Sequence, residues 1–158
     1  MSHRTPHAVA ALGLLLAFAL GSPAAVQGVC LTLDMDQQVV TYPIAFGDNL
    51  HLSFRHSIYG SQVEEQFVVA PKGFRAIKLR YADLRLVEFY GHETATNEGG
   101  WWVVHKPGRE FPSLDLRVSR EASIGITFLD QTISLQNNTA IDGRARLSVS
   151  PCARKSHD

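Results

Sequence analysis

Residues 50–69 of the chain have the sequence LHLSFRHSIYGSQVEEQFVV. Up to Phe54, apolar residues stand at every second position, and a period of two is typical of a β-strand with one buried face. The same alternation places His56 on the apolar side. We expect a loop over Ser57 to Ser61 to return the chain, so this stretch predicts a β-hairpin.

The returning strand brings a second ionisable residue to the apolar face. Val63, Phe67 and Val69 set that face, and Glu65 falls in step with them. Antiparallel pairing of the two strands predicts that His56 and Glu65 are direct or diagonal neighbours. An imidazole and a carboxylate that face a core are costly unless they are paired or put to use. This pair is therefore the first candidate functional site.

Residues 1–28 are typical of a cleaved signal peptide. Arg4 and two histidines form a weakly basic start, residues 8–20 are apolar, and small residues up to Gly28 suit a signal peptidase. An apolar run of about 13 residues is too short for a membrane span, which needs about 20. The sequence therefore predicts a periplasmic or secreted protein with no membrane span in its mature chain.

The mature chain, of about 130 residues, is long enough for one domain and too short for two. We expect a β domain over 29–152 and a C-terminal tail over 153–158. Arg4 is the only formally charged residue that cleavage removes, which leaves a net charge near −1. This balance argues against nucleic acid or anionic lipid as the main partner.

Two cysteines, Cys30 and Cys152, lie near the two ends of the mature chain. In an oxidising compartment such a pair usually forms a disulfide, which here would tie the first strand to the last. Two alternatives stay open, namely lipidation of Cys30 and two separate thiols. Val29 stands where a lipoprotein box normally has a small residue, which argues against lipidation.

Short alternating segments fill most of the mature chain. They include residues 29–35, 39–45, 74–80, 101–105, 114–118, 124–135 and 147–149. The apolar parity changes near Ala82 and Asp83, which predicts a bulge or a short bend. We find no eleven-residue stretch with a helical period. About nine or ten short antiparallel strands at this spacing predict an all-β domain, either a β-sandwich or a partly open β-barrel.

The long segment from Tyr90 to Gly100, YGHETATNEGG, has no apolar period and is the second candidate element. We expect an irregular loop, and loops on rigid β scaffolds often carry binding groups. His92 and Glu93 are its candidate side chains. Whichever of Trp101 and Trp102 faces outward could anchor an interface.

Several pieces of the chain together resemble the domain of unknown function 1850 family. They are His56-Ser57, Val63-Glu64-Glu65, Phe89-Tyr90-Gly91, Gly100-Trp101 and the run from Leu114 to Val118. The resemblance covers roughly Leu50 to Val149. The chain departs from the family pattern at Gly91-His92-Glu93-Thr94, where members usually have a Gly-x-Pro stretch.

Members of that family are small prokaryotic proteins, often exported and encoded beside TRAP transporters of the TAXI type. Those transporters move small organic acids with the help of a periplasmic solute-binding protein. The resemblance therefore implies a transporter membrane subunit or a solute-binding protein as partner, with a small organic acid as a further candidate. It implies no reaction, because the family has no settled biochemical activity.

The residues favour a non-enzymatic accessory or binding protein without a cofactor. Ser57 follows His56 directly, so on a regular strand the two side chains point to opposite faces, which argues against a serine nucleophile with a histidine base. The predicted ligand- or partner-binding residues are His56, Ser57, Glu65, Gly91, His92, Glu93 and Trp101.

Two alternatives to a partner site stay open. The side chains of His56, Glu65, His92 and Glu93 have the nitrogen and oxygen donors that would suit a metal ion. The His56–Glu65 pair could instead fix the hairpin register and serve architecture alone.

Overall fold

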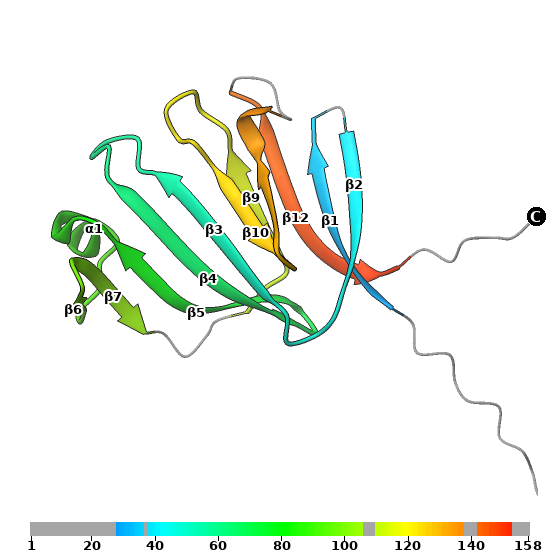
Figure 1. Cartoon of the computed structure of the whole chain (residues 1–158), viewed down its shortest axis with the longest axis horizontal. Coiled ribbons are helices and arrows are strands. Elements are labelled where there is room, and N and C mark those ends of the chain that lie inside the picture. The colour runs from blue at the N-terminus through cyan, green and yellow to red at the C-terminus, as the bar shows by residue number, and fades with distance from the viewer. Residues whose placement is uncertain (1–27, 37, 106–109, 138–141, 153–158) are drawn as a thin grey trace, which may run out of the picture.

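The computed structural model describes residues 28–36, 38–105, 110–137 and 142–152. Two antiparallel sheets form a β-sandwich-like fold that is not closed into a barrel (Figure 1). The all-β prediction is therefore confirmed. The described residues form twelve strands rather than nine or ten, because two short strands, β6 (Thr96–Glu98) and β8 (Glu110–Phe111), lie in segments without an apolar alternation.

The smaller sheet has four strands in the order β2-β1-β12-β9. Their bounds are β1 Val29–Met35, β2 Gln38–Ile44, β9 Ser113–Arg117 and β12 Arg144–Pro151. β1 lies in the middle, where Leu31 faces Val149 of β12 on one side and Tyr42 of β2 on the other. β2 and β9 are the two edges of this sheet.

The larger sheet has the order β11-β10-β3-β4-β5-β7-β6, with β8 added beside β5. The bounds of the remaining strands are β3 Asn49–Arg55, β4 Gln62–Ala70, β5 Gly73–Tyr81, β7 Trp101–His105, β10 Gly125–Phe128 and β11 Gln131–Ser134. β3 and β4 are the two strands of the predicted hairpin, and they lie at the centre of the sheet.

Leucines dominate the core between the two sheets. Leu31 and Leu33 of β1 and Leu147 of β12 pack against Leu50 and Leu52 of β3, and all five are almost fully buried. The alternation of the sequence places these side chains on the inner faces. Burial of apolar surface at about 25 cal/mol per Å² is the main force that holds the sheets together.

A helix, α1 (Leu84–Phe89), replaces the expected continuation of the strand after Ala82. The parity change marks the change from strand to helix and not a bulge. Asp83 is the N-cap, and its side chain accepts a hydrogen bond from the Arg85 N–H at 2.9 Å. None of the helices among the described residues, α1 and the 3-10 helix Leu135–Asn137 included, is long and apolar enough to cross a membrane.

α1 covers one end of the larger sheet and creates a second core. Leu86 and Val87 pack there against Val63, Leu79 and other apolar side chains of β4, β5 and β7. Phe54 contacts both cores and so connects them. The larger sheet is thus covered by the smaller sheet at one end and by α1 at the other (Figure 1).

Two irregularities differ from the expected pattern. The bulge of the larger sheet lies in β5 at Ile77, because Gln66 faces Lys78 whereas Phe67 faces Ala76. The segment expected to be one irregular loop contains β6, which pairs with β7 through a two-residue turn at Gly99 and Gly100. Both glycines have positive φ, which a tight hairpin turn of this kind requires.

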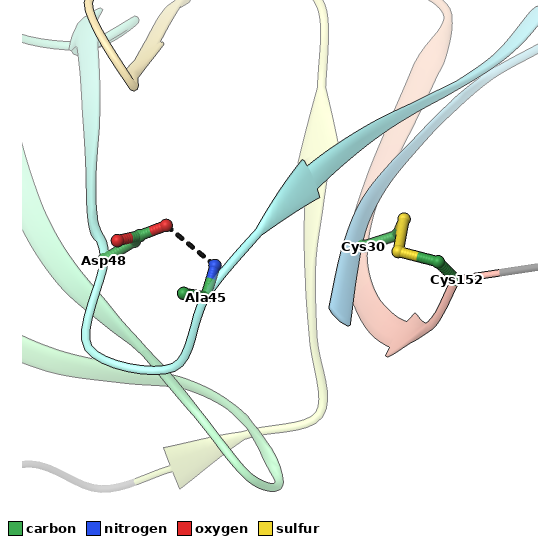
Figure 2. Close-up of a disulfide and its surroundings, with 4 residues drawn as sticks. All are labelled: Cys30, Ala45, Asp48 and Cys152. Atoms are coloured by element: carbon green, nitrogen blue, oxygen red, sulfur yellow. Dashed lines mark hydrogen bonds between the residues drawn. A yellow bond between two sulfur atoms is a disulfide. The ribbon is translucent and has the colours of Figure 1, made fainter. Parts of the chain in front are cut away.

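The predicted disulfide between Cys30 and Cys152 is confirmed (Figure 2), with an S–S distance of 2.02 Å. It leaves Cys30 no thiol to carry a lipid. The nearby β2–β3 turn is closed by the Asp48 carboxylate, which accepts the Ala45 N–H at 2.8 Å. The predicted signal peptide falls outside the described residues except for Gly28, and so does the tail over 153–158.

Candidate functional site

His56 follows the last residue of β3 and begins the loop that joins β3 to β4. Its N–H donates to the Ser61 carbonyl at 2.9 Å, and its carbonyl accepts the Gly60 N–H at 2.8 Å. These bonds close the loop that was expected over Ser57 to Ser61. The side chain is 7% exposed, so the predicted placement of His56 on the apolar side is confirmed.

The two nitrogens of the His56 ring have different surroundings. Nδ1 accepts the backbone N–H groups of Ile58 and Tyr59 at 3.3 and 3.4 Å. When the ring is neutral, the proton therefore resides on Nε2. No residue that the structure describes forms a hydrogen bond with Nε2. The loop thus fixes the tautomer and keeps one N–H donor available.

Aromatic side chains surround the ring. It stacks on Tyr59 with centroids 5.4 Å apart, and it meets Phe89 and Tyr90 edge-on at 4.9 and 5.8 Å. Ile58, at the turn of the loop, is 69% exposed, while Phe89 is 50% and Tyr90 39% exposed. We call Ile58, Tyr59, Phe89 and Tyr90 the aromatic tip. It joins the β3–β4 loop to the end of α1.

Glu65 is not a neighbour of His56, so that prediction is wrong. The β3–β4 register places Leu52 opposite Glu65 and Phe54 opposite Val63. In an antiparallel pair, one residue forward on β3 corresponds to one residue back on β4, so the residue opposite His56 is Ser61. Glu65 therefore lies two same-face positions away from the partner of His56.

The inner face of the larger sheet holds Glu65 between Leu52 of β3 and Leu79 of β5. Burial raises the pKa of its carboxyl group to about 6, because the charged form loses hydration. Among the described residues, none forms a hydrogen bond with this carboxylate. Burial raises the pKa values of Tyr81 and Tyr90, and the charge of Glu65 raises them further. Tyr90 therefore lies near both His56 and Glu65.

His92 is placed by the C-terminus of α1. The N–H groups of Gly91 and His92 donate to the carbonyls of Glu88 and Val87, the pattern of a Schellman motif, and Gly91 adopts φ +67°. This cap turns the chain back, and His92 Nε2 lies 2.8 Å from the Tyr81 hydroxyl. Gly91 therefore acts as a helix cap that orients His92.

The four residues proposed as metal ligands are not gathered at one point. Glu93 is exposed, and His92 Nε2 is engaged by the Tyr81 hydroxyl. No group of three or more metal-ligating side chains occurs in the part of the chain that the structure describes. The arrangement gives the metal hypothesis no support.

Trp101 faces outward from the larger sheet, and Trp102 packs inward against the second core. The Arg80 guanidinium lies over the Trp101 ring, 4.5 Å from the centroid, and the same Arg80 pairs with Glu64. Trp101 therefore belongs to the outer face of the sheet. It does not share a site with His56.

A cleft of about 550 Å³ opens between the end of β3 and the edge strand β9. On the β3 side it is lined by Phe54, Arg55, His56 and Ser57, joined by Tyr90 from the aromatic tip. On the other side it is lined by Asp115, Leu116, Arg117, Ser119, Ala122, Ile124 and Asp142. The cleft joins His56 and Ser57 to residues about 60 positions further along the chain, which no local pattern in the sequence links to them.

The charges at the cleft are unevenly neutralised. The Asp115 carboxylate accepts a hydrogen bond from Arg146 Nε at 2.6 Å. Arg117, in contrast, lies opposite another cation, Arg144 of the neighbouring strand β12. Within the described residues, neither Arg55 nor Arg117 forms a salt bridge. Neither arginine could be predicted as part of a site, because nothing in their local pattern separates them from an ordinary solvated face.

Comparison with known proteins gives one match. The sequence profile described as "Domain of unknown function (DUF1850)" matches residues 50–135, just over half of the chain. The matched segment contains the aromatic tip, Glu65 and every residue of the cleft except Asp142. No curated protein and no solved structure matches the chain. The chain belongs to the family described as Domain of unknown function (DUF1850), the family that its residues resemble.

Proposed function

We propose that the protein is a non-enzymatic, exported accessory protein that binds another protein through its aromatic tip. The observation that carries the proposal is the exposure of Ile58, Phe89 and Tyr90 around a buried histidine. Aromatic and large apolar side chains that gather at an exposed point are typical anchors of protein interfaces. The tip lies inside the segment that matches the family profile.

The arrangement around His56 favours binding over catalysis. Nδ1 is engaged by backbone N–H groups and not by a serine hydroxyl, and the neighbouring Ser57 is exposed in the loop. The ring also fixes the tip, because it contacts Tyr59, Phe89 and Tyr90 at once. His56 therefore acts as the internal support of the surface that we propose for the partner.

We further propose that the partner is a component of an organic-acid transport system of the TAXI type, either a membrane subunit or the solute-binding protein. This part of the proposal rests on the family resemblance. A disulfide that joins the first strand to the last is consistent with work in an oxidising compartment outside the cytoplasm.

A crosslinking pull-down from native cell envelopes tests the proposal. Ile58→Ser removes the most exposed apolar side chain of the tip, and Val39→Ser is the matched control, because Val39 is 64% exposed on the distant edge strand β2. We expect the wild type and the control to capture a transporter component and Ile58→Ser to lose it. Equal capture by all three would contradict the tip as the contact, and failure of the wild type would contradict the transporter link.

A further inference from the structure

The edge strand β9 borders the cleft with an open row of backbone groups. β9 is the last strand of the smaller sheet, and among the strands that the structure describes only β12 pairs with it. Alternate N–H and C=O groups of an edge strand point away from the sheet. Within the described residues, no backbone hydrogen bond closes this side of residues 113–117. With no partner in the described part of the chain, the outward groups offer an edge to which another strand can pair.

Other edges of the two sheets have features that discourage pairing. β2 contains Pro43, which has no N–H to donate, and β6 and β11 have three and four residues. Short strands and proline are common protections of sheet edges. β9 has five residues and carries neither proline nor lysine. Its open edge also lies beside a cleft, which gives an added strand a place to lie.

The size and the lining of the cleft suit a short, extended peptide segment. With a rise of about 3.3 Å per residue, a strand spacing of about 4.8 Å and a sheet distance of about 10 Å, one strand residue occupies on the order of 160 Å³. A cleft of about 550 Å³ therefore holds roughly three or four such residues. Phe54, Leu116 and Ile124 offer apolar contacts to alternate side chains.

The charges at the cleft specify one feature of the occupant. Arg55 and Arg117 are cations without an ion-pair partner among the described residues. Of the two carboxylates in the lining, Asp115 is engaged by Arg146, and Asp142 forms no salt bridge within the described residues, so the unpaired charges of the cleft leave a net positive charge. Arg117 faces Arg144 directly, and like charges opposite one another on neighbouring strands repel. A carboxylate beside Arg117 would relieve this repulsion. His56 lines the same cleft.

We propose that the cleft binds an extended, acidic peptide segment that adds to β9 as a further strand, with a carboxylate side chain on Arg117. Main-chain hydrogen bonds to an exposed edge supply affinity in this mode of recognition, and pockets for alternate side chains supply specificity. The inference rests on the proposed function, because it assigns the binding mode and chemistry of the protein partner.

The test uses a phage-displayed library of random linear peptides of about twelve residues as the probe, selected on the purified wild-type protein. Selected peptides are then measured against Arg117→Glu and against the control Arg120→Glu, since Arg120 is exposed nearby but does not line the cleft. We expect acidic peptides that bind the control normally and Arg117→Glu about tenfold more weakly. Arg117→Glu should stay folded, because the new carboxylate faces Arg144.

A second measurement separates strand addition from a merely electrostatic contact. Each selected peptide is resynthesised with N-methyl groups on one set of alternate residues or on the other. A peptide that pairs with β9 loses binding with the set whose N–H groups face the strand and keeps it with the other set. Equal effects of both sets would overturn strand addition.

Four other outcomes would also overturn the proposal. They are no selected peptide at all, selected peptides that bind Arg117→Glu as tightly as the wild type, Arg117-dependent binding of succinate without peptide binding, and a dimer in light scattering that Arg117→Glu dissociates. A failure of this proposal can be distinguished from a failure of the proposed function. If capture from envelopes depends on Ile58 but not on Arg117, the tip is the contact and the cleft is not.

Discussion

His56 is a buried histidine whose ring is held by its own loop. Nδ1 accepts two backbone N–H groups, and the ring packs between Tyr59 and Phe89. His56→Ala leaves both N–H groups without their acceptor and opens a gap, so we expect a loss of about 1–3 kcal/mol of unfolding free energy. Urea unfolding measures it, with His51→Ala, an exposed position on the same strand, as control. Equal midpoints for the two variants would contradict this role.

The raised pKa of the Glu65 carboxyl group predicts how the stability of the fold depends on pH. Burial raises its pKa from 4.5 to about 6, so the folded state binds the proton more tightly than the unfolded state. The ionised carboxylate therefore costs stability, and the cost appears as pH rises from about 4.5 through 6 and stays above it. A shift of this size corresponds to about 2 kcal/mol.

The matched variants are Glu65→Gln and Glu64→Gln, since Glu64 lies on the outer face and pairs with Arg80. We expect Glu65→Gln to stabilise the protein at neutral pH by up to about 2 kcal/mol and to flatten the wild-type decline between about pH 4.5 and 6. Denaturant unfolding across that range measures both effects. An unchanged profile in Glu65→Gln would show that another group titrates.

The helix α1 was only partly predictable from the sequence. Its six residues make less than two turns, too few for a helical period to emerge, so Leu84 and Leu86 fit a strand after a bend equally well. Two local signals were available, namely Asp83 as an N-cap and Gly91 as a C-cap. The strands themselves were predictable, because one face of each is buried.

The cap of α1 carries a prediction of its own. Asp83→Ala removes the acceptor of the Arg85 N–H, and we expect a loss of about 1 kcal/mol, the usual cost of a lost N-cap. Asp83→Asn keeps an oxygen in the same place and should lose much less. Thermal unfolding distinguishes the two variants, and equal losses would mean that the ion pair with Arg85, not the cap, carries the contribution.

The register between β3 and β4 determines which side chains lie beside His56, and the sequence alone does not fix that register. The hairpin was predictable from alternation, but a choice among loop closures moves Glu65 by whole positions relative to His56. The cleft depends on β9 lying across from the end of β3, and that placement follows from how the two sheets pack. Residues such as Arg117 enter the site only through this packing.

At the scale of the whole molecule, the Cys30–Cys152 disulfide joins residues 122 positions apart. The crosslink restricts the unfolded chain over nearly the entire domain, so we expect the Cys30→Ser, Cys152→Ser double variant to lose about 2–5 kcal/mol. The leucine core between the sheets remains, so the variant should still fold at moderate temperature. Guanidinium unfolding with and without reductant measures the loss, and reductant should have no effect on the double variant.

Site-specific photo-crosslinking tests whether the aromatic tip binds a partner. A photoreactive amino acid is placed at Ile58 or, as control, at the similarly exposed Val39, and each variant is irradiated in native envelopes. We expect a discrete adduct with a transporter subunit or solute-binding protein from position 58 and none from position 39. Adducts from both positions, or none from position 58, would contradict it.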